Sequence, residues 1–252
     1  MPDNKQAGSV ERAFAILEFM GQSQRQWGIS ELGRKFQIPK STTHSLMVTL
    51  ENLGYVLRDD DRRKFSAAVR FYGVAASPMK RLVQTETALS PMNALVAETG
   101  LTAHLAVLDQ GQAVYVQKVE GANAARFDTY IGKRTNLHCT AVGKVLLAYA
   151  PLDAQQELVS RVHLMRHTDH TIASGAALRL ELQAVRRAGF AFDDQEEELE
   201  ARCIAVPVLN RLGQVTASLG LCGSLSQIRD DNAHALHQRV RQAAQTISGT
   251  RS

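Results

Sequence analysis

Two short runs near the N-terminus carry side chains suited to binding DNA. The first, KSTTHS, follows a proline and offers polar or cationic groups: Lys40, Ser41, Thr42, His44 and Ser45. The second, RDDDRRK, is an acidic turn between apolar stretches, and its cations are Arg58, Arg62, Arg63 and Lys64. Short polar groups on a helix can contact base edges in a major groove, whereas cations attract phosphates and read no sequence. We therefore expect residues 40–64 to bind double-stranded DNA.

A second chemical feature is the segment LHCTAVGK, where a loop is expected to become a helix. The first turn of a helix has free N–H groups and a partial positive charge, so it can hold an anion. Small side chains let a ligand approach this backbone, and the candidate carboxylate site comprises Thr140, Ala141, Val142 and Gly143. The same pattern also fits a plain capped helix without a ligand.

The third feature is the run FDDQEEELEARCIAVPV, in which an acidic loop separates two apolar strands. Charge alone predicts a solvated loop, although Asp193 directly follows an apolar strand and can point inward. Cys203 opens the next strand, where a cysteine is usually a small core side chain. The chain's three cysteines, Cys139, Cys203 and Cys222, show neither disulfide nor zinc-ligand spacing, so no metal and no cofactor is expected.

The apolar pattern predicts the elements that hold the DNA-binding runs. Residues 30–53 fit two helices joined by a turn at Ile38-Pro39, with Ser30 as the first N-cap and Gly54 ending the second helix. The second helix would bury one face, comprising Leu46, Leu50 and Leu53. A preceding helix would also have one apolar face: Val10, Ala13, Phe14, Leu17 and Met20. With a hairpin after them, these elements predict a winged helix-turn-helix domain over residues 1–66, followed by a linker helix over residues 67–80.

Residues 81–252 alternate hairpins with helices, which is typical of an α+β fold, an antiparallel sheet packed with helices. The expected strands are 102–107, 113–119, 126–131, 190–192, 203–209 and 214–221. The expected helices are 80–98, 140–149, one opened by Asp153, 174–187 and 230–247. The net charge of +4 is divided equally between residues 1–66 and the remainder, so only the placement of cations argues for nucleic acid. No segment has the pattern of a signal peptide or a membrane span, so a cytoplasmic protein is expected.

Five segments in order resemble IclR-type bacterial transcriptional regulators over nearly the whole chain. They are VERAFAIL from Val10, PKSTTH from Pro39, LHCTAVGK from Leu137, GFAFDDQE from Gly189 and RCIAVPV from Arg202. The resemblance implies a winged helix-turn-helix and a C-terminal GAF-like domain that binds a small organic acid. It also implies a homodimer, pairing into a tetramer as a dimer of dimers on palindromic operator DNA of the bacterial nucleoid.

The ligand positions that the resemblance implies are Ala141, Val142, Asp193 and Cys203, which coincide with the anion site expected from the helix start. The family's closing serines are replaced here by a segment containing Gly220 and Cys222, which predicts a roomier, less polar wall and an effector such as an aromatic carboxylate. Two further departures are Ser45, where the family often has arginine, and Glu200, where it commonly has glycine. The first changes the expected operator preference, and the second changes the expected path of the acidic loop.

Two functions compete with a ligand-responsive regulator, whether repressor or activator. A ligand-independent architectural DNA-binding protein would leave the helix-start segment without a role. An enzyme acting on a small acid would use His138, Cys139, Asp193 or Cys203 as nucleophile and base. The sequence has no nucleophile elbow, phosphate-binding glycine loop or metal spacing, so no catalytic residue is assigned.

Overall fold

The computed structural model describes residues 8–23, 25–74, 85–122 and 124–249. The chain divides into two compact units, residues 1–78 and 79–252, which are described separately. Within the described residues, no helix is both long and apolar enough to cross a lipid bilayer.

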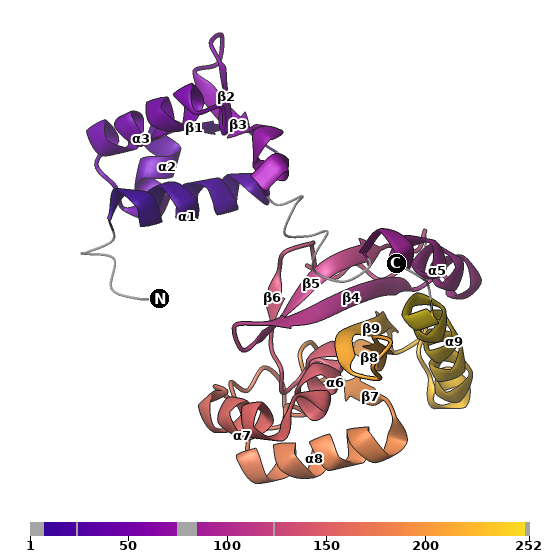
Figure 1. The fold of residues 1–252 in the computed structure, drawn as a ribbon. Coiled ribbons are helices and arrows are strands. Elements are labelled where there is room, and N and C mark those ends of the chain that lie inside the picture. The colour runs from indigo at the N-terminus through magenta and orange to yellow at the C-terminus, as the bar shows by residue number, and fades with distance from the viewer. Residues whose placement is uncertain (1–7, 24, 75–84, 123, 250–252) are drawn as a thin grey trace. The chain divides into compact units, whose positions relative to one another are not determined.

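The N-terminal unit is a winged helix-turn-helix, as predicted (Figure 1). Its helices are α1 (Ser9–Gly21), α2 (Ile29–Phe36) and α3 (Lys40–Asn52), and its strands are β1 (Trp27–Gly28), β2 (Val56–Asp59) and β3 (Lys64–Ala67). The strands form an antiparallel sheet in the order β1-β3-β2, in which β1 was not predicted. The wing is therefore anchored to the chain that precedes α2.

Two predictions about the first helices are wrong in detail. Helix α2 begins at Ile29 after the N-cap Gly28, because Glu31 Oε2 accepts the Gly28 N–H at 2.8 Å, and Ser30 lies inside the first turn. In α1, Val10 and Phe14 are 69% and 55% exposed. Leu17 and Met20 are buried as predicted, and Ile16, which was not predicted, is buried with them.

Helix α3 is rotated slightly from the predicted orientation. It buries Thr43, Met47 and Leu50, whereas Leu46 is half-buried and Leu53 is 50% exposed. Thr43 is buried because its hydroxyl donates to the Pro39 carbonyl at 3.1 Å, which satisfies it without water. A polar residue in the first turn of α3 thus belongs to the core.

The segment predicted as a linker helix lies only partly within the described residues. Ala67 is the last residue of β3, and helical backbone begins at Arg70 and continues to residue 74. The rest of this segment, residues 75–80, lies outside the described part of the chain.

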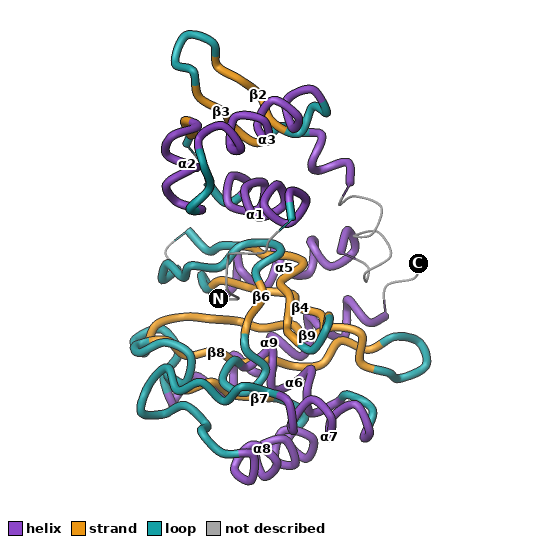
Figure 2. Tube along the Cα trace, turned by 90° about the vertical axis from the view of Figure 1, so that its left-hand side faces the viewer, coloured by secondary structure: helices purple, strands orange, loops and turns teal. Residues whose placement is uncertain are grey.

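The C-terminal unit is a six-stranded antiparallel sheet with helices on both faces, which confirms the α+β prediction (Figures 1 and 2). The strand order is β6-β5-β4-β9-β8-β7. The strands are β4 (Thr102–Asp109), β5 (Gln112–Val119), β6 (Arg134–Thr135), β7 (Ala191–Asp194), β8 (Ala201–Leu209) and β9 (Val215–Ser224). The helices are α5 (Thr85–Thr99), α6 (Ala141–Tyr149), α7 (Leu152–Arg161), α8 (Gly175–Ala188) and α9 (Asp230–Gly249). One hydrophobic core lies between the sheet and α5 with α9, and the other between the sheet and α6 to α8.

The predicted strand over residues 126–131 is wrong. This stretch is irregular, and the edge strand is the short β6 that follows it. Two of its carbonyls accept from side chains rather than from a neighbouring strand: Lys118 Nζ donates to Thr129 O at 2.6 Å, and Lys133 Nζ donates to Asp128 O. A smaller correction concerns α7, whose N-cap is Pro151, so that Asp153 lies in its first turn.

Candidate functional site

A cavity of about 230 Å³ lies at the start of α6, between that helix, the sheet and two loops. Of the residues predicted to bind an effector, six line it: Thr140, Ala141, Val142, Asp193, Cys203 and Cys222. They come from α6 and its N-cap, the end of β7, and the adjacent strands β8 and β9. The fold thus brings together segments that are far apart in the sequence.

Gly143 and Gly220, also predicted as effector-binding, are not among the lining residues. A Cβ at Gly143 would lie 2.3 Å from Asn136 O, and one at Gly220 would lie 2.7 Å from Val142 Cγ1. Both distances are shorter than any tolerated contact, so these positions need glycine for packing. Their lack of a side chain allows the segments that form the cavity wall to pack closely together.

The first turn of α6 presents backbone donors to the cavity. The Thr140 hydroxyl accepts the Gly143 N–H at 3.1 Å, and Thr140 O accepts the Lys144 N–H at 2.9 Å. The N–H groups of Ala141 and Val142 precede these and have no acceptor inside the helix. Because both residues line the cavity, a ligand anion can take these two donors.

Asp193 is buried, with 3% of its surface exposed, which confirms that it points inward. Its Oδ1 accepts the Glu196 N–H at 2.8 Å. Burial raises the pKa of the Asp193 carboxyl well above its usual range, because the charged form loses its hydration. A neutral carboxyl at this place can donate a hydrogen bond to a ligand carboxylate.

The remaining lining residues were not found from the sequence: His104, Tyr115, Phe127, Asp128, Thr129, Lys133, Thr135, Glu197, Glu198 and Ala201. Phe127, Asp128 and Thr129 belong to the segment wrongly predicted as strand, Lys133 follows that segment, and no local pattern marks them. The alternation of β4 and β5 could have shown that His104 and Tyr115 lie among buried positions, since they pack with ring centroids 4.7 Å apart. The cavity therefore has an aromatic side and a side rich in carboxylates.

A buried ion pair joins α6 to the acidic loop. Lys144 is 1% exposed, and its Nζ lies 2.6 Å from Glu196 Oε1 and 2.9 Å from Glu181 Oε1. It also donates to the Phe192 carbonyl. The loop predicted to be a solvated surface is thus pinned at Glu196, which is 8% exposed, while Glu198 and Glu200 are exposed.

Glu200 occupies the position at which the resemblance implies glycine. Its φ is 64°, in the left-handed region that glycine adopts without strain. The loop thus holds a non-glycine residue in a conformation that costs about 1–2 kcal/mol. One backbone hydrogen bond joins the loop to β8, from Gln195 N to Ala201 O at 3.0 Å, and another joins it to the residue after β9, from Leu225 N to Glu200 O at 3.1 Å.

Two cysteines face each other across adjacent strands in the cavity wall, where Cys203 is the register partner of Cys222. The hydrogen bond from the Cys203 thiol lowers the pKa of Cys222, while it raises the pKa of Cys203. We expect a small methanethiosulfonate reagent to modify Cys222 faster than Cys139, whose pKa burial raises. Mass spectrometry over time would show this, with Cys222→Ser removing the fast phase. A fast phase that survives in Cys222→Ser would contradict the assignment.

In the N-terminal unit, the predicted DNA-contacting residues of α3 differ in exposure. Lys40, Ser41, His44 and Ser45 are exposed, whereas Thr42 is half-buried. The Ser45 hydroxyl donates to Ser41 O at 3.2 Å, so it is already engaged with its own helix. The outward face of α3 therefore presents one lysine, one histidine and small hydroxyl groups.

The wing turn lies between β2 and β3 and carries the other predicted cations. Arg58, Arg62 and Arg63 are exposed, and Lys64 is half-buried. Arg58 pairs with Asp60 at 3.0 Å, and the Arg62 N–H donates to Asp59 at 3.1 Å. The carboxylates thus shape the turn and leave the guanidinium groups at the surface, where they can attract phosphates.

The comparisons with known proteins agree with both halves of this architecture. The family model for the IclR helix-turn-helix domain matches residues 9–60, and that for the C-terminal part of the bacterial transcriptional regulator IclR matches residues 79–249. The HTH-type transcriptional regulator KdgR of Dickeya chrysanthemi is 35% identical over 98% of this chain and 80% of its own length.

Two solved structures show the same fold over almost the whole chain. The crystal structure of Thermotoga maritima IclR has a TM-score of 0.81 and 28% identity, covering 95% of this chain and 97% of its own. An IclR homologue from Microbacterium hydrocarbonoxydans, complexed with 4-hydroxybenzoate, has a TM-score of 0.82 and 25% identity, covering 96% and 98%. The chain therefore belongs to the IclR family of bacterial transcriptional regulators, which bind DNA and respond to ligands.

Proposed function

We propose that the cavity at the start of α6 binds a small organic acid and that this binding changes the affinity of the protein for its operator. The observation that carries the proposal is the cavity itself, where the first turn of α6 and the buried Asp193 converge. The ligand carboxylate accepts the N–H groups of Ala141 and Val142 and a hydrogen bond from neutral Asp193. By linkage, operator DNA must change acid affinity by the same factor.

An aromatic carboxylate is the proposed effector class. Tyr115 and Phe127 line the cavity, and Cys222 provides a wall that is less polar than serine would be. A structurally similar IclR homologue holds 4-hydroxybenzoate, which supports this class. The cavity volume of about 230 Å³ is smaller than that of most ligand sites, which favours a small molecule.

A hydroxylated aliphatic acid is the second candidate, and a specific observation favours it. Three further carboxylates line the cavity, those of Asp128, Glu197 and Glu198. Ionised carboxylates only accept hydrogen bonds, so they suit ligand hydroxyl groups. Such an acid would place its carboxylate at α6 and its hydroxyl groups against the acidic loop.

Thermal unfolding with a panel of aromatic, hydroxylated aliphatic and dicarboxylic acids tests the proposal. A ligand at 100 times its dissociation constant stabilises the folded state by about 2.7 kcal/mol. We expect one class to raise the melting temperature, and Asp193→Ala to remove the rise. No shift with any acid would contradict the proposal for this cavity.

On the DNA side, we propose that the wing supplies phosphate contacts and α3 reads bases. Replacing Arg63 with alanine should weaken binding to specific and random DNA alike and reduce the salt slope by about one. Ser41→Ala should mainly reduce discrimination between operator and random DNA. Fluorescence anisotropy at several salt concentrations measures both, with Arg161→Ala in the C-terminal unit as the control. Equal losses on both DNAs for Ser41→Ala would contradict its reading role.

We also propose a homodimer that pairs into a tetramer, acting on the nucleoid in the cytoplasm. The support is an apolar groove in the N-terminal unit, lined by the exposed Val10, Phe14, Leu53 and Val74. A second copy there would give the two-fold symmetry that a palindromic operator requires. No catalytic role is proposed, because burial raises the pKa of the Cys139 thiol, and the hydrogen bond to Cys222 together with burial raises that of Cys203.

A further inference from the structure

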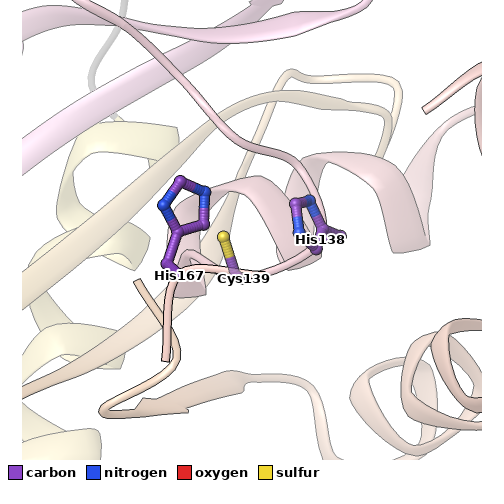
Figure 3. Close-up of side chains that lie close together, drawn as sticks. All are labelled: His138, Cys139 and His167. Atoms are coloured by element: carbon purple, nitrogen blue, oxygen red, sulfur yellow. The ribbon is translucent and has the colours of Figure 1, made fainter. Parts of the chain in front are cut away.

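A cluster of potential metal ligands lies beside the effector cavity, formed by His138, Cys139 and His167 (Figure 3). One ligand atom from each residue lies within 4.8 Å of the others. His138 and Cys139 precede α6, and His167 follows α7. In Figure 3 the Cys139 thiol lies between the two imidazole rings.

The hydrogen bonds of His138 leave one ring nitrogen available to a metal. Its Nε2 lies 3.0 Å from Met165 O, an acceptor only, so Nε2 carries the proton and donates. Nδ1 is then unprotonated, and it is buried without a hydrogen-bond partner among the described residues. A metal-bound histidine usually donates its second N–H to a carbonyl or carboxylate in this way.

Glu197 approaches two members of this cluster, Cys139 and His167, and is the candidate for a fourth ligand. Its Oε2 accepts from Cys139 Sγ at 2.7 Å and lies 3.8 Å from His167 Nε2. The Asn136 amide nitrogen lies 3.0 Å from His167 Nε2 and 3.1 Å from Glu197 Oε2, so one donor faces the lone pairs of both. A cation in this position would replace that shared donor.

We propose that His138 Nδ1, Cys139 Sγ, His167 Nε2 and Glu197 Oε2 bind a zinc ion. Thiolate, imidazole and carboxylate in a four-ligand set are typical of Zn²⁺. Ligands of tetrahedral zinc lie about 3.5 Å apart, so the atoms of His138, Cys139 and His167 must approach one another by roughly 1 Å, whereas Glu197 Oε2 must move away from Cys139 Sγ. His167, whose side chain is 21% exposed, can make that movement at the surface. On binding, the Cys139 thiol gives its proton to solvent and its sulfur coordinates the metal.

The proposed zinc would act on the effector cavity through Glu197, which also lines that cavity. Zinc adds two positive charges and removes one thiol proton, so the site becomes more positive by one unit. It also joins the loop before α6, the segment after α7 and the acidic loop. Zinc is therefore expected to increase the affinity for a carboxylate ligand, and the ligand is expected to increase the affinity for zinc by the same factor.

Cobalt binding to the full-length protein, after removal of metals with a chelator, tests the site. One Co²⁺ per chain should give a thiolate-to-cobalt charge-transfer band and the intense visible bands of four-coordinate cobalt, and Zn²⁺ should displace it. His167→Ala should weaken binding by at least about a hundredfold, since even loss of a partner beyond the ligands weakens metal sites 10- to 100-fold. His170→Ala is the matched control, because His170 is exposed in the same segment.

Two outcomes would overturn the proposal: a cobalt spectrum without the thiolate band, or a His167→Ala variant that binds as tightly as the wild type. Cys139→Ser should remove the band. If the Cys139→Ser variant does not fold, the His167→Ala result decides the question alone.

A second measurement compares the affinity for 4-hydroxybenzoate with and without zinc, with at least about a fivefold gain expected. That measurement rests on the proposed effector site, whereas the cobalt spectrum does not. Absence of 4-hydroxybenzoate binding thus counts only against the effector class, whereas binding that zinc leaves unchanged counts against the coupling.

Discussion

Lys144→Met is expected to destabilise the C-terminal unit by about 3–5 kcal/mol, because it leaves the buried Glu196 carboxylate without its partner. Glu196 is 8% exposed, and Lys144 Nζ approaches it to 2.6 Å. Methionine fills a similar volume, so the loss comes from charge rather than from a cavity. Thermal unfolding should show the transition of this unit lowered by about 10 °C.

The effect of pH on Lys144→Met separates charge from packing. Burial raises the pKa of Glu196 even with the lysine present, and loss of the lysine raises it further. A carboxyl with a raised folded pKa contributes stability at low pH that is lost as the pH rises through that pKa. The loss of stability in the variant should therefore shrink on acidification. Adding Glu196→Gln to the same chain should recover most of the lost stability. A deficit that is independent of pH would show that packing around α6 is responsible.

The control for this prediction is Arg161→Met, which also removes a cation near the end of a helix. Arg161 is 77% exposed and pairs with Glu157 at 2.8 Å within α7. Exposed pairs of this kind contribute little because water screens them. We expect its melting temperature to change by a small fraction of the Lys144→Met effect.

The sequence predicted the fold well where periodicity and turn residues agree. Helix α6 begins after the Thr140 cap, and α8 ends before Gly189 at a φ of 78°. The hairpin between β4 and β5 turns through Gln110 and Gly111, both with positive φ, as its residue types predicted. Each of these signals is local, so a single sequence contains it.

The errors arise where tertiary contacts decide. The stretch over residues 126–131 has the composition of a strand, but the carbonyls of Asp128 and Thr129 are taken by lysine side chains. Helix α1 exposes Val10 and Phe14, which the amphipathic pattern would place inside. Neither the lysine contacts nor the neighbours of α1 can be read from the segments themselves.

The candidate site shows the same division. Helix-start chemistry and the family resemblance identified six lining residues, and the position of Asp193 after an apolar strand predicted its burial. The aromatic side of the cavity and the histidine–cysteine cluster were missed, because their members come from segments distant in the sequence. Cys139 and His167 have no motif spacing, and only the packing of α6 against the following loops brings them together.

Effector binding is expected to weaken as the pH rises, by up to about tenfold per pH unit above the folded pKa of Asp193. Burial raises that pKa, and the neutral carboxyl donates to the ligand, whereas the ionised form repels a carboxylate. The unliganded protein therefore takes up a proton when it binds the acid above that pKa. Titration calorimetry across pH, using the acid that the unfolding panel selects, measures both the affinity and the proton uptake.

Asp193→Asn provides the matched control, since asparagine keeps the shape, donates permanently and can still accept the Glu196 N–H. Its effector affinity should lack the pH dependence that ionisation of Asp193 causes. Its free energy of unfolding should rise relative to that of the wild type as the pH rises. The second effect follows because a raised carboxyl pKa contributes stability below its unfolded pKa and loses it above the folded one. If Asp193→Asn shows the same pH dependence as wild type, the titrating group is another one near the cavity. Glu196, Lys144 and Cys222 are among the groups that act on the pKa of Asp193, and the Cys222→Ser variant would then show whether Cys222 is the titrating group.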